Sequence, residues 1–199
     1  MKRSTLLAIL FCMLALATPK KASAQDFAIK SNLLYDATAT INLGVEFKVA
    51  PKWTIEASGN FNDWTIRTDH RWKHWLVQPE VRYWLCEAMH GNFFGLQLHG
   101  GQYNMSKVPL LEKINFLGTD FRGLQNGRYQ GWYAGAGITY GHAWILGTHW
   151  NIEAEIGIGW AYTRFDKYPC ASCGRKLEEN RVHNYVGPTE AAVNLVYIF

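Results

Sequence analysis

The chain has 199 residues, a formal net charge of +4 and an aromatic content of 15%. Residues 1–24 have the pattern of a secretory signal and hold four cations but no acidic residue, so the predicted mature chain of residues 25–199 is electrically neutral. Its length is typical of one domain. A neutral chain is not expected to bind nucleic acid, because that function depends on a basic surface.

The signal pattern has three adjoining parts. Lys2 and Arg3 form a basic start, residues 6–17 form an apolar run, and Ala22 and Ala24 form a small-residue cleavage site. Beyond this segment no apolar run reaches the roughly 20 residues that a membrane helix requires. We therefore expect an exported protein without a transmembrane helix.

From residue 27 onward, apolar and aromatic residues alternate with small or polar ones, which is the period of a β-strand. At residues 150–162, for example, Trp150 and Ile152 fall on one face while Asn151 and Glu153 fall on the other. Pro79 is expected to mark a β-bulge, because its ring nitrogen cannot donate to the sheet. The pattern predicts eight strands, at residues 28–35, 41–49, 53–61, 75–85, 93–103, 129–146, 150–162 and 184–199.

The predicted connections alternate between short and long. Residues 37–40 form a tight first connection, and the later ones alternate between short (50–52, 86–92, 147–149) and long (67–74, 106–128, 166–183). Such alternation is expected of an even-stranded barrel, in which successive turns emerge at opposite ends. The predicted fold is an all-β, eight-stranded, antiparallel up-and-down β-barrel formed by residues 25–199.

Two kinds of barrel fit eight such strands, and they differ in where the apolar face points. A lipocalin-like soluble barrel turns that face inward around a ligand, whereas a transmembrane barrel turns it outward into lipid. We expect the transmembrane arrangement, because small polar residues suit a narrow eight-stranded interior better than large aromatic ones. The aromatic residues also gather at both ends of the strands, as interfacial girdles do. The predicted girdles comprise Phe47, Trp53, Tyr83, Phe94, Trp144, Trp150 and Tyr197 toward the short connections, and Tyr35, Phe61, Trp75, Trp132, Trp160, Tyr162 and Tyr185 toward the long ones.

The last strand carries a further pattern. Phe199 is preceded on the same face by Ala191, Val193, Leu195 and Tyr197. This resembles the C-terminal signature that outer-membrane barrels present to the barrel-assembly machinery. An ordinary amphipathic strand that ends in Phe is the alternative. The C-terminal pattern and the signal pattern together predict a location in the cell outer membrane.

The predicted mature chain resembles the small eight-stranded barrels of Gram-negative outer membranes, typified by the OmpA transmembrane domain and OmpX. The segments KSNLLYD (30–36), QGWYAGAG (130–137) and YVGPT (185–189) are more closely similar to an uncharacterised family of outer-membrane proteins of about this length. Some members of that family are encoded near surface-fimbria genes. The resemblance implies contact with outer-membrane lipid and lipopolysaccharide, and a surface-appendage or envelope protein as a partner. It implies no catalytic residue and no cofactor.

The predicted inward face carries a cluster of polar and ionisable residues. In a narrow interior such charges either pair across strands or change their protonation. We expect a salt-bridged polar plug, since small barrels fill their interior with side chains. A proton or cation path is the alternative, with acid–base chemistry as a more distant one. The cluster comprises Lys30, Glu46, Lys48, Glu56, Glu80, Arg82, His99, Glu153, Glu155 and Glu190.

Three cysteines follow the signal segment, and their odd number means that one thiol is left over or pairs between molecules. Cys170 and Cys173 are separated by two residues, a spacing found in local disulfides, redox dithiols and halves of zinc sites. A second pair of ligands at a suitable spacing is missing. We expect a loop disulfide or plain thiols, and no metal.

A lipid A-modifying enzyme is a second hypothesis, because some outer-membrane barrels of this size are lipid A acyltransferases or deacylases. That chemistry needs a His with a Ser or acidic partner at the outer rim. The candidates have no recognisable catalytic spacing, so we expect no catalytic residue. The leading hypothesis is a structural or surface-interaction protein, and a narrow ion or proton pore is a third. The rim candidates are Asp69, His70, His74, Asp166, Ser172 and His183.

The long connections carry an excess of basic residues. With both termini in the periplasm, these connections face the cell exterior and act as the recognition surface. Arg71, Lys73, Arg122 and Arg128 are predicted to contact phosphates of lipopolysaccharide or an acidic surface polymer, since Arg binds phosphate through paired hydrogen bonds. A solvated charged rim is the alternative.

Overall fold

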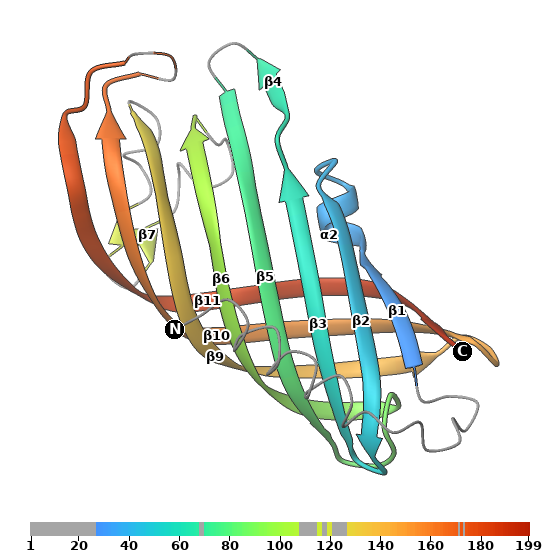
Figure 1. The fold of residues 1–199 in the computed structure, drawn as a ribbon. Coiled ribbons are helices and arrows are strands. Elements are labelled where there is room, and N and C mark those ends of the chain that lie inside the picture. Colours follow the sequence, from blue (N-terminus) through green and yellow to red (C-terminus); the bar gives the residue numbers. More distant parts are fainter. Residues whose placement is uncertain are drawn as a thin grey trace, which may run out of the picture.

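In the computed structural model, eight long strands form one antiparallel sheet that closes into a ring (Figure 1). The structure describes residues 27–67, 70–107, 115–116, 119–120, 127–170, 172 and 174–199, so the predicted signal segment lies outside the described residues. Each long strand pairs with the next one along the chain, and the last pairs with the first. The predicted all-β, eight-stranded, up-and-down arrangement is confirmed. The strands are β1 (Phe27–Asn32), β2 (Ile41–Ala50), β3 (Trp53–Asn62), β5 (His70–Trp84), β6 (Gly91–Ser106), β9 (Arg128–Ile145), β10 (Trp150–Tyr168) and β11 (Glu178–Ile198).

Three short strands lie within the long connections. β4 (Thr65–Arg67) pairs with the beginning of β5, and β7 (Asn115–Phe116) pairs with β8 (Thr119–Asp120) in a separate two-stranded sheet between β6 and β9. The long strands also extend further into these connections than the sequence pattern predicts. β5 begins at residue 70 rather than 75, and β11 begins at 178 rather than 184.

The first predicted strand is too long, because a one-turn helix replaces its end. The helix α2 (Leu33–Asp36) begins after Asn32, whose side chain accepts a hydrogen bond from the backbone N–H of Leu34. Asp36 in turn accepts hydrogen bonds from Ser31 and from the Asn42 amide, at 2.8 and 2.7 Å. An asparagine cap of this kind stabilises a helical turn over a continuing strand. No helix in the described part of the chain is long and apolar enough to cross a membrane.

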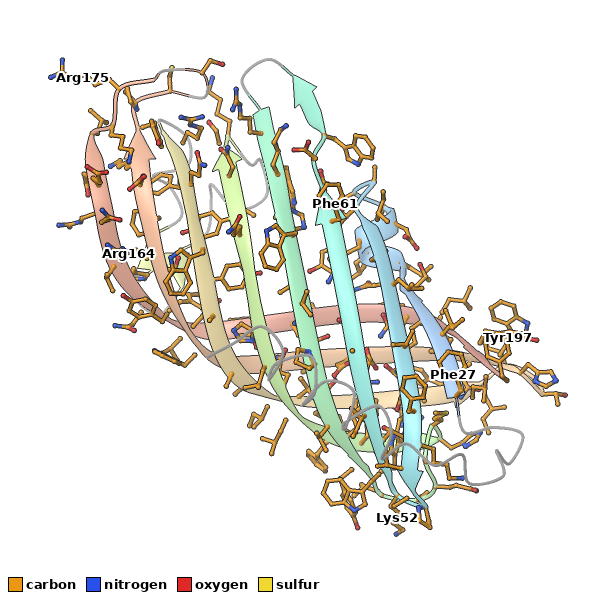
Figure 2. The ribbon with its side chains drawn as sticks, viewed as in Figure 1. Phe27, Lys52, Phe61, Arg164, Arg175 and Tyr197 are labelled. Carbon is orange, nitrogen blue, oxygen red and sulfur yellow. The ribbon has the colours of Figure 1, made fainter. Side chains whose placement is uncertain are left out.

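The two ends of the ring differ in their connections. Residues 51–52, 85–90 and 146–149 form short connections at one end, and the remaining, longer connections lie at the other. Lys52 and Arg175 mark these opposite ends (Figure 2). We refer to them as the short-connection end and the long-connection end.

The inner and outer faces of the ring show an inverted distribution of apolar and charged residues. Leu96, Ile138 and Ile158 are paired directly across β6, β9 and β10, and their side chains are 68%, 56% and 60% exposed. Arg82 and Glu153, by contrast, point inward and are 0% and 1% exposed. The strands therefore place charge in the interior and aliphatic side chains on the outer surface.

The position of the bulge corrects the prediction made for Pro79. Pairing between β5 and β6 skips Gln78 and Pro79 but resumes in the same register at Glu80, so the missing N–H of Pro79 needs no extra residue. The register shifts instead between β10 and β11, where Gly157 pairs with Glu190 but Ile158 pairs with Pro188. The extra residue on β11 reverses which side chains face inward on the far side of the shift.

Two aromatic residues that the sequence pattern places in the outer girdle lie in the interior instead. Tyr185 lies beyond the β11 bulge and pairs with the buried Ala161, which brings its ring to the interior. Tyr35 belongs to α2 rather than to a strand, and its ring also lines the interior. Both predictions of an outward girdle position are wrong for these two residues.

Candidate functional site

The barrel interior is closed at the short-connection end by an apolar cluster, which we call the apolar cap. Its largest members are Trp84 and Phe93, whose ring centroids are 4.6 Å apart. The Trp84 indole N–H donates to the Thr54 hydroxyl at 2.9 Å, and the Asn151 amide donates to the backbone carbonyl of Met89 at 2.8 Å. The connection between β5 and β6 thus folds into the ring and seals it. The apolar cap comprises Ala28, Trp84, Ala88, Met89, Phe93, Ala143, Val196 and Ile198.

Above the cap lies a set of buried charges, the ion network, with Arg82 at its centre. The Arg82 guanidinium lies 2.5 Å from carboxylate oxygens of both Glu56 and Glu155, 2.7 Å from Glu80 and 3.0 Å from Glu153, and Glu46 follows at 3.4 Å. Its carbon Cζ also lies 4.5 Å from the centre of the Phe93 ring. One side chain from β5 therefore contacts acidic residues on β2, β3 and β10 across the ring.

Lys30 on β1 is the second cation of the ion network. Its Nζ lies 2.5 Å from Glu46, 2.8 Å from Glu56 and 2.9 Å from Glu153. The Asn194 amide on β11 donates to Glu153 at 3.2 Å. Lys30 and Arg82 thus share three carboxylates, and the network joins six of the eight strands.

Three carboxylates gather on one side of this network. Oxygens of Glu80, Glu155 and Glu190 lie within 4.8 Å of one another, and the Thr139 hydroxyl donates to Glu80. Gly95 makes room for the Glu80 carboxylate, because a Cβ at this position would overlap it. Carboxylate oxygens this close can share protons or hold a hard cation. Arg82 already contacts two of the three, so part of the negative charge is compensated within the chain.

The ten residues predicted to form the inward cluster separate into three groups. Eight of them meet in the ion network or beside it. Lys48 lies at the short-connection end, partly exposed and 3.8 Å from Glu87. His99 lies on the other side of the network and lines a separate cavity. The eight that meet are Lys30, Glu46, Glu56, Glu80, Arg82, Glu153, Glu155 and Glu190.

That cavity, which we call the aromatic cavity, has a volume of about 640 Å³ and lies toward the long-connection end. The sequence pattern does not predict this cavity, because it favours large aromatic rings on the outer surface. The strand period contained the signal: Trp72 and His74 share a face with Gln78, and Tyr133 shares one with Thr139. Glycine on the neighbouring strand provides space, since Gly135 on β9 pairs with His99 on β6 and a Cβ there would overlap the His99 ring.

Among the described residues considered for catalysis, His74 lines two cavities, one together with His183 and a second together with Asp166. His74 and His183 both line the aromatic cavity, but no Asp, Glu or Ser of the described chain lines it with them. Asp166 lies at the long-connection end and contacts Lys176 at 2.8 Å. Asp69 and the His70 side chain lie outside what the structure describes.

The predicted basic contacts at the long connections are partly occupied within the chain. Lys73 lies 2.8 Å from Asp63, and the Arg128 guanidinium lies 3.9 Å from the centre of the Tyr168 ring. Arg71 pairs through its backbone with Ser106 near the beginning of β5. Arg122 lies outside the described residues.

The predicted assembly residues lie along the seam where β11 meets β1. Tyr197 and Phe199 form ring contacts with Trp150 and Phe27, at centroid distances of 4.9 and 5.3 Å, and Figure 2 shows Phe27 and Tyr197 close together. The backbone N–H of Phe199 donates to the carbonyl of Phe27 at 3.0 Å. Ala191, Val193 and Leu195 continue the outward face of β11.

The cysteines described by the structure differ in state. Cys86 is a free, exposed thiol in the connection between β5 and β6. Cys170 is disulfide-bonded, as one of the alternatives for this loop allows. Cys173 lies outside the described residues.

The fold and its interior define a closed eight-stranded β-barrel with a charged, capped interior and an apolar outer surface. The chain belongs to the family described as "Protein of unknown function (DUF3575)", which matches residues 8–199. Comparisons with curated proteins and with solved structures found no match. Membership of an uncharacterised family is thus confirmed, whereas the likeness to OmpA and OmpX stays a prediction.

Proposed function

We propose that the protein is an outer-membrane β-barrel with a structural or surface-interaction role. The observation that carries the proposal is the inverted distribution of side chains, with Arg82 and its carboxylates inside and aliphatic residues outside. A barrel surrounded by water would bury its apolar residues and expose its charges. The opposite arrangement is favourable when hydrocarbon surrounds the ring and every strand is paired.

The outer surface supports this proposal through its continuity. The row that contains Leu96, Ile138 and Ile158 extends through Val81 to Ile55 by direct cross-strand pairing. All five side chains are more than two-fifths exposed. A contiguous apolar surface that runs across five strands is unusual for a water-soluble monomer and fits contact with lipid.

Aromatic pairs border this aliphatic surface on both sides. Trp53 packs against Tyr83 near the short-connection end, with ring centroids 5.0 Å apart. Trp132 packs against Tyr162 near the long-connection end, with centroids 5.6 Å apart. Aromatic rings of this kind favour the two interfaces of a membrane. Their positions toward the two ends of the barrel support a barrel that spans the membrane along its axis.

The interior favours a structural or interaction role over a conducting pore. The apolar cap closes the short-connection end, and the ion network fills the region above it. We therefore propose that recognition belongs to the long connections on the cell exterior. Outer-membrane lipid and lipopolysaccharide are the proposed partners of the surface, the barrel-assembly machinery inserts the chain, and a surface-appendage or envelope protein is the proposed partner of the connections.

A pair of matched substitutions tests the membrane proposal. Ile158 lies within the aliphatic row and Leu177 lies in the connection between β10 and β11, and their side chains are 60% and 59% exposed. In a bilayer, Ile158→Arg should destabilise the barrel by about 2–4 kcal/mol, and Leu177→Arg should have little effect. Unfolding by urea in lipid vesicles measures both. Equal stability of the two variants would refute a membrane-spanning surface, because in water both positions tolerate Arg.

A further inference from the structure

The aromatic cavity is a blind chamber within the barrel. The apolar cap and the ion network close the barrel below it, so among the described residues the cavity extends toward the long-connection end. Its volume of about 640 Å³ is within the range of small-molecule sites. Its walls are formed largely by the rings of Trp72, Tyr103, Tyr129, Tyr133, Phe165 and Tyr185.

The cavity differs sharply in charge from the ion network beside it. None of the described residues that line it is Asp, Glu, Lys or Arg. A charged ligand would leave water without gaining an opposite charge, which is unfavourable. The lining therefore selects a neutral ligand, and the flat rings of its walls favour a flat, aromatic one, because such rings stack in offset or tilted arrangements.

Four buried nitrogen atoms, on three side chains, add a requirement for hydrogen bonding. His99 is 6% exposed, and neither of its ring nitrogens has a hydrogen-bond partner among the described residues. The Trp72 indole nitrogen and the His74 Nδ1 lack partners in the same way. All three side chains line the aromatic cavity. Buried polar groups are rarely left without partners in folded proteins, so these nitrogens point to a bound molecule.

The chemistry of these nitrogens identifies the groups that the ligand must carry. An indole N–H can only donate, so the partner of Trp72 must be an acceptor. A neutral imidazole presents one donor and one acceptor, so His99 can donate to a carbonyl oxygen and accept from a hydroxyl. The pairing of β5 with β6 places His99 opposite Gln78, six residues along β5 from Trp72, so the two side chains need separate acceptors. Two carbonyl oxygens on opposite edges of one aromatic ring can accept from the Trp72 indole N–H and from the donor nitrogen of His99.

We propose that the aromatic cavity binds a neutral, planar aromatic carbonyl compound of the quinone class, stacked on the tyrosine rings and hydrogen-bonded to Trp72 and His99. The site goes beyond the proposed outer-membrane role. It does not depend on that role, because binding to the purified full-length protein in detergent is independent of where the barrel resides in the cell.

The test uses 2-methyl-1,4-naphthoquinone as the probe and naphthalene as the matched compound without carbonyl groups. Equilibrium dialysis against the detergent-solubilised protein reports saturable binding of either compound. Trp72→Phe and His99→Phe remove hydrogen-bonding nitrogens while keeping a ring, and each should weaken quinone binding by about three- to tenfold. Neither substitution should change the binding of naphthalene, which should be weaker than that of the quinone.

A pair of Ala→Phe substitutions separates the cavity from the outer surface. Ala161 lines the cavity, whereas Ala134 is exposed and pairs with the outward Tyr162. Ala161→Phe should abolish saturable binding, and Ala134→Phe should preserve it. If Ala161→Phe does not fold, as judged by loss of the heat-modifiable band, Trp72→Phe and His99→Phe decide the question. Equal quinone binding in the wild-type protein and in both of those variants would overturn the proposal, as would saturable binding of palmitate without binding of the quinone.

Discussion

Replacing Arg82 by Met removes the charge at the centre of the ion network while preserving an unbranched side chain. Glu80 and Glu155 would lose their closest cation, at present 2.7 and 2.5 Å away, whereas Glu46, Glu56 and Glu153 would keep Lys30. Removing one partner of a buried ion pair typically costs about 3–5 kcal/mol, because the remaining charge stays buried without compensation. We expect a loss of that size in the free energy of unfolding.

Equilibrium unfolding by urea, followed by the heat-modifiable band on gels, measures this loss. Lys48→Met is the matched control: Lys48 is partly exposed and 3.8 Å from Glu87, so its replacement should cost less than about 1 kcal/mol. Adding Glu80→Gln and Glu155→Gln to Arg82→Met should restore part of the stability by removing the uncompensated charges. A triple variant no more stable than Arg82→Met, or an Arg82→Met variant as stable as Lys48→Met, would refute the reasoning.

Three further predictions concern single positions. Gly95→Ala should destabilise the barrel by about 1–3 kcal/mol, because the added Cβ overlaps the Glu80 carboxylate and the Thr139 hydroxyl; urea unfolding should show no such loss for Gly59→Ala, where nothing lies within 4 Å. In intact cells, a membrane-impermeant maleimide should leave the free thiol of Cys86 unmodified, and labelling without outer-membrane permeabilisation would contradict the proposed orientation. Hydrogen bonds from Lys176 and from the backbone N–H of Asn180 hold the pKa of Asp166 below its usual range at the exposed end of β10. These two hydrogen bonds should therefore order the connection between β10 and β11 at neutral pH, and the order should be lost in acid, as the pH falls through the lowered pKa of Asp166. The amide resonance of Asn180 should shift over that pH range, and Asp166→Asn should abolish the pH dependence of the shift.

The strands and most of the ion network could be predicted because both depend on a period of two residues. Alternation along β10 places Glu153 and Glu155 on the face opposite Ile152 and Ile156, and the structure retains that assignment. Which charges touch could not be predicted, since contacts across the ring depend on the register between strands. Lys48 shows the difference: it shares the inward face with Glu46 but lies one step closer to the short-connection end, beside Glu87.

The aromatic cavity was missed for a different physical reason. Small polar residues were expected inside because an eight-stranded barrel is narrow, and the ion network satisfies that expectation in the middle of the barrel. Toward the long-connection end, Gly131 and Gly135 carry no side chain, and an added Cβ would overlap Phe165 at the first position and His99 at the second, both of which line the cavity. The free volume of the interior thus depends on which residues lie beside one another on paired strands. The sequence of a single strand does not contain that information.

The bulge on β11 explains why the assignments on that strand were correct only in part. Side chains of a strand alternate between two faces, so one inserted residue reverses every assignment beyond it. Counting back from Phe199 gives the right outward set as far as Ala191, whereas beyond Pro188 the same count inverts, and Tyr185 turns into the aromatic cavity. A proline within a strand indicates a bulge only where its missing N–H coincides with a shift in pairing. Pro188 meets that condition and Pro79 does not, because pairing between β5 and β6 resumes unshifted at Glu80. The chemistry of the cavity wall on β11 therefore depends on one backbone irregularity, whose position is decided by the pairing between strands.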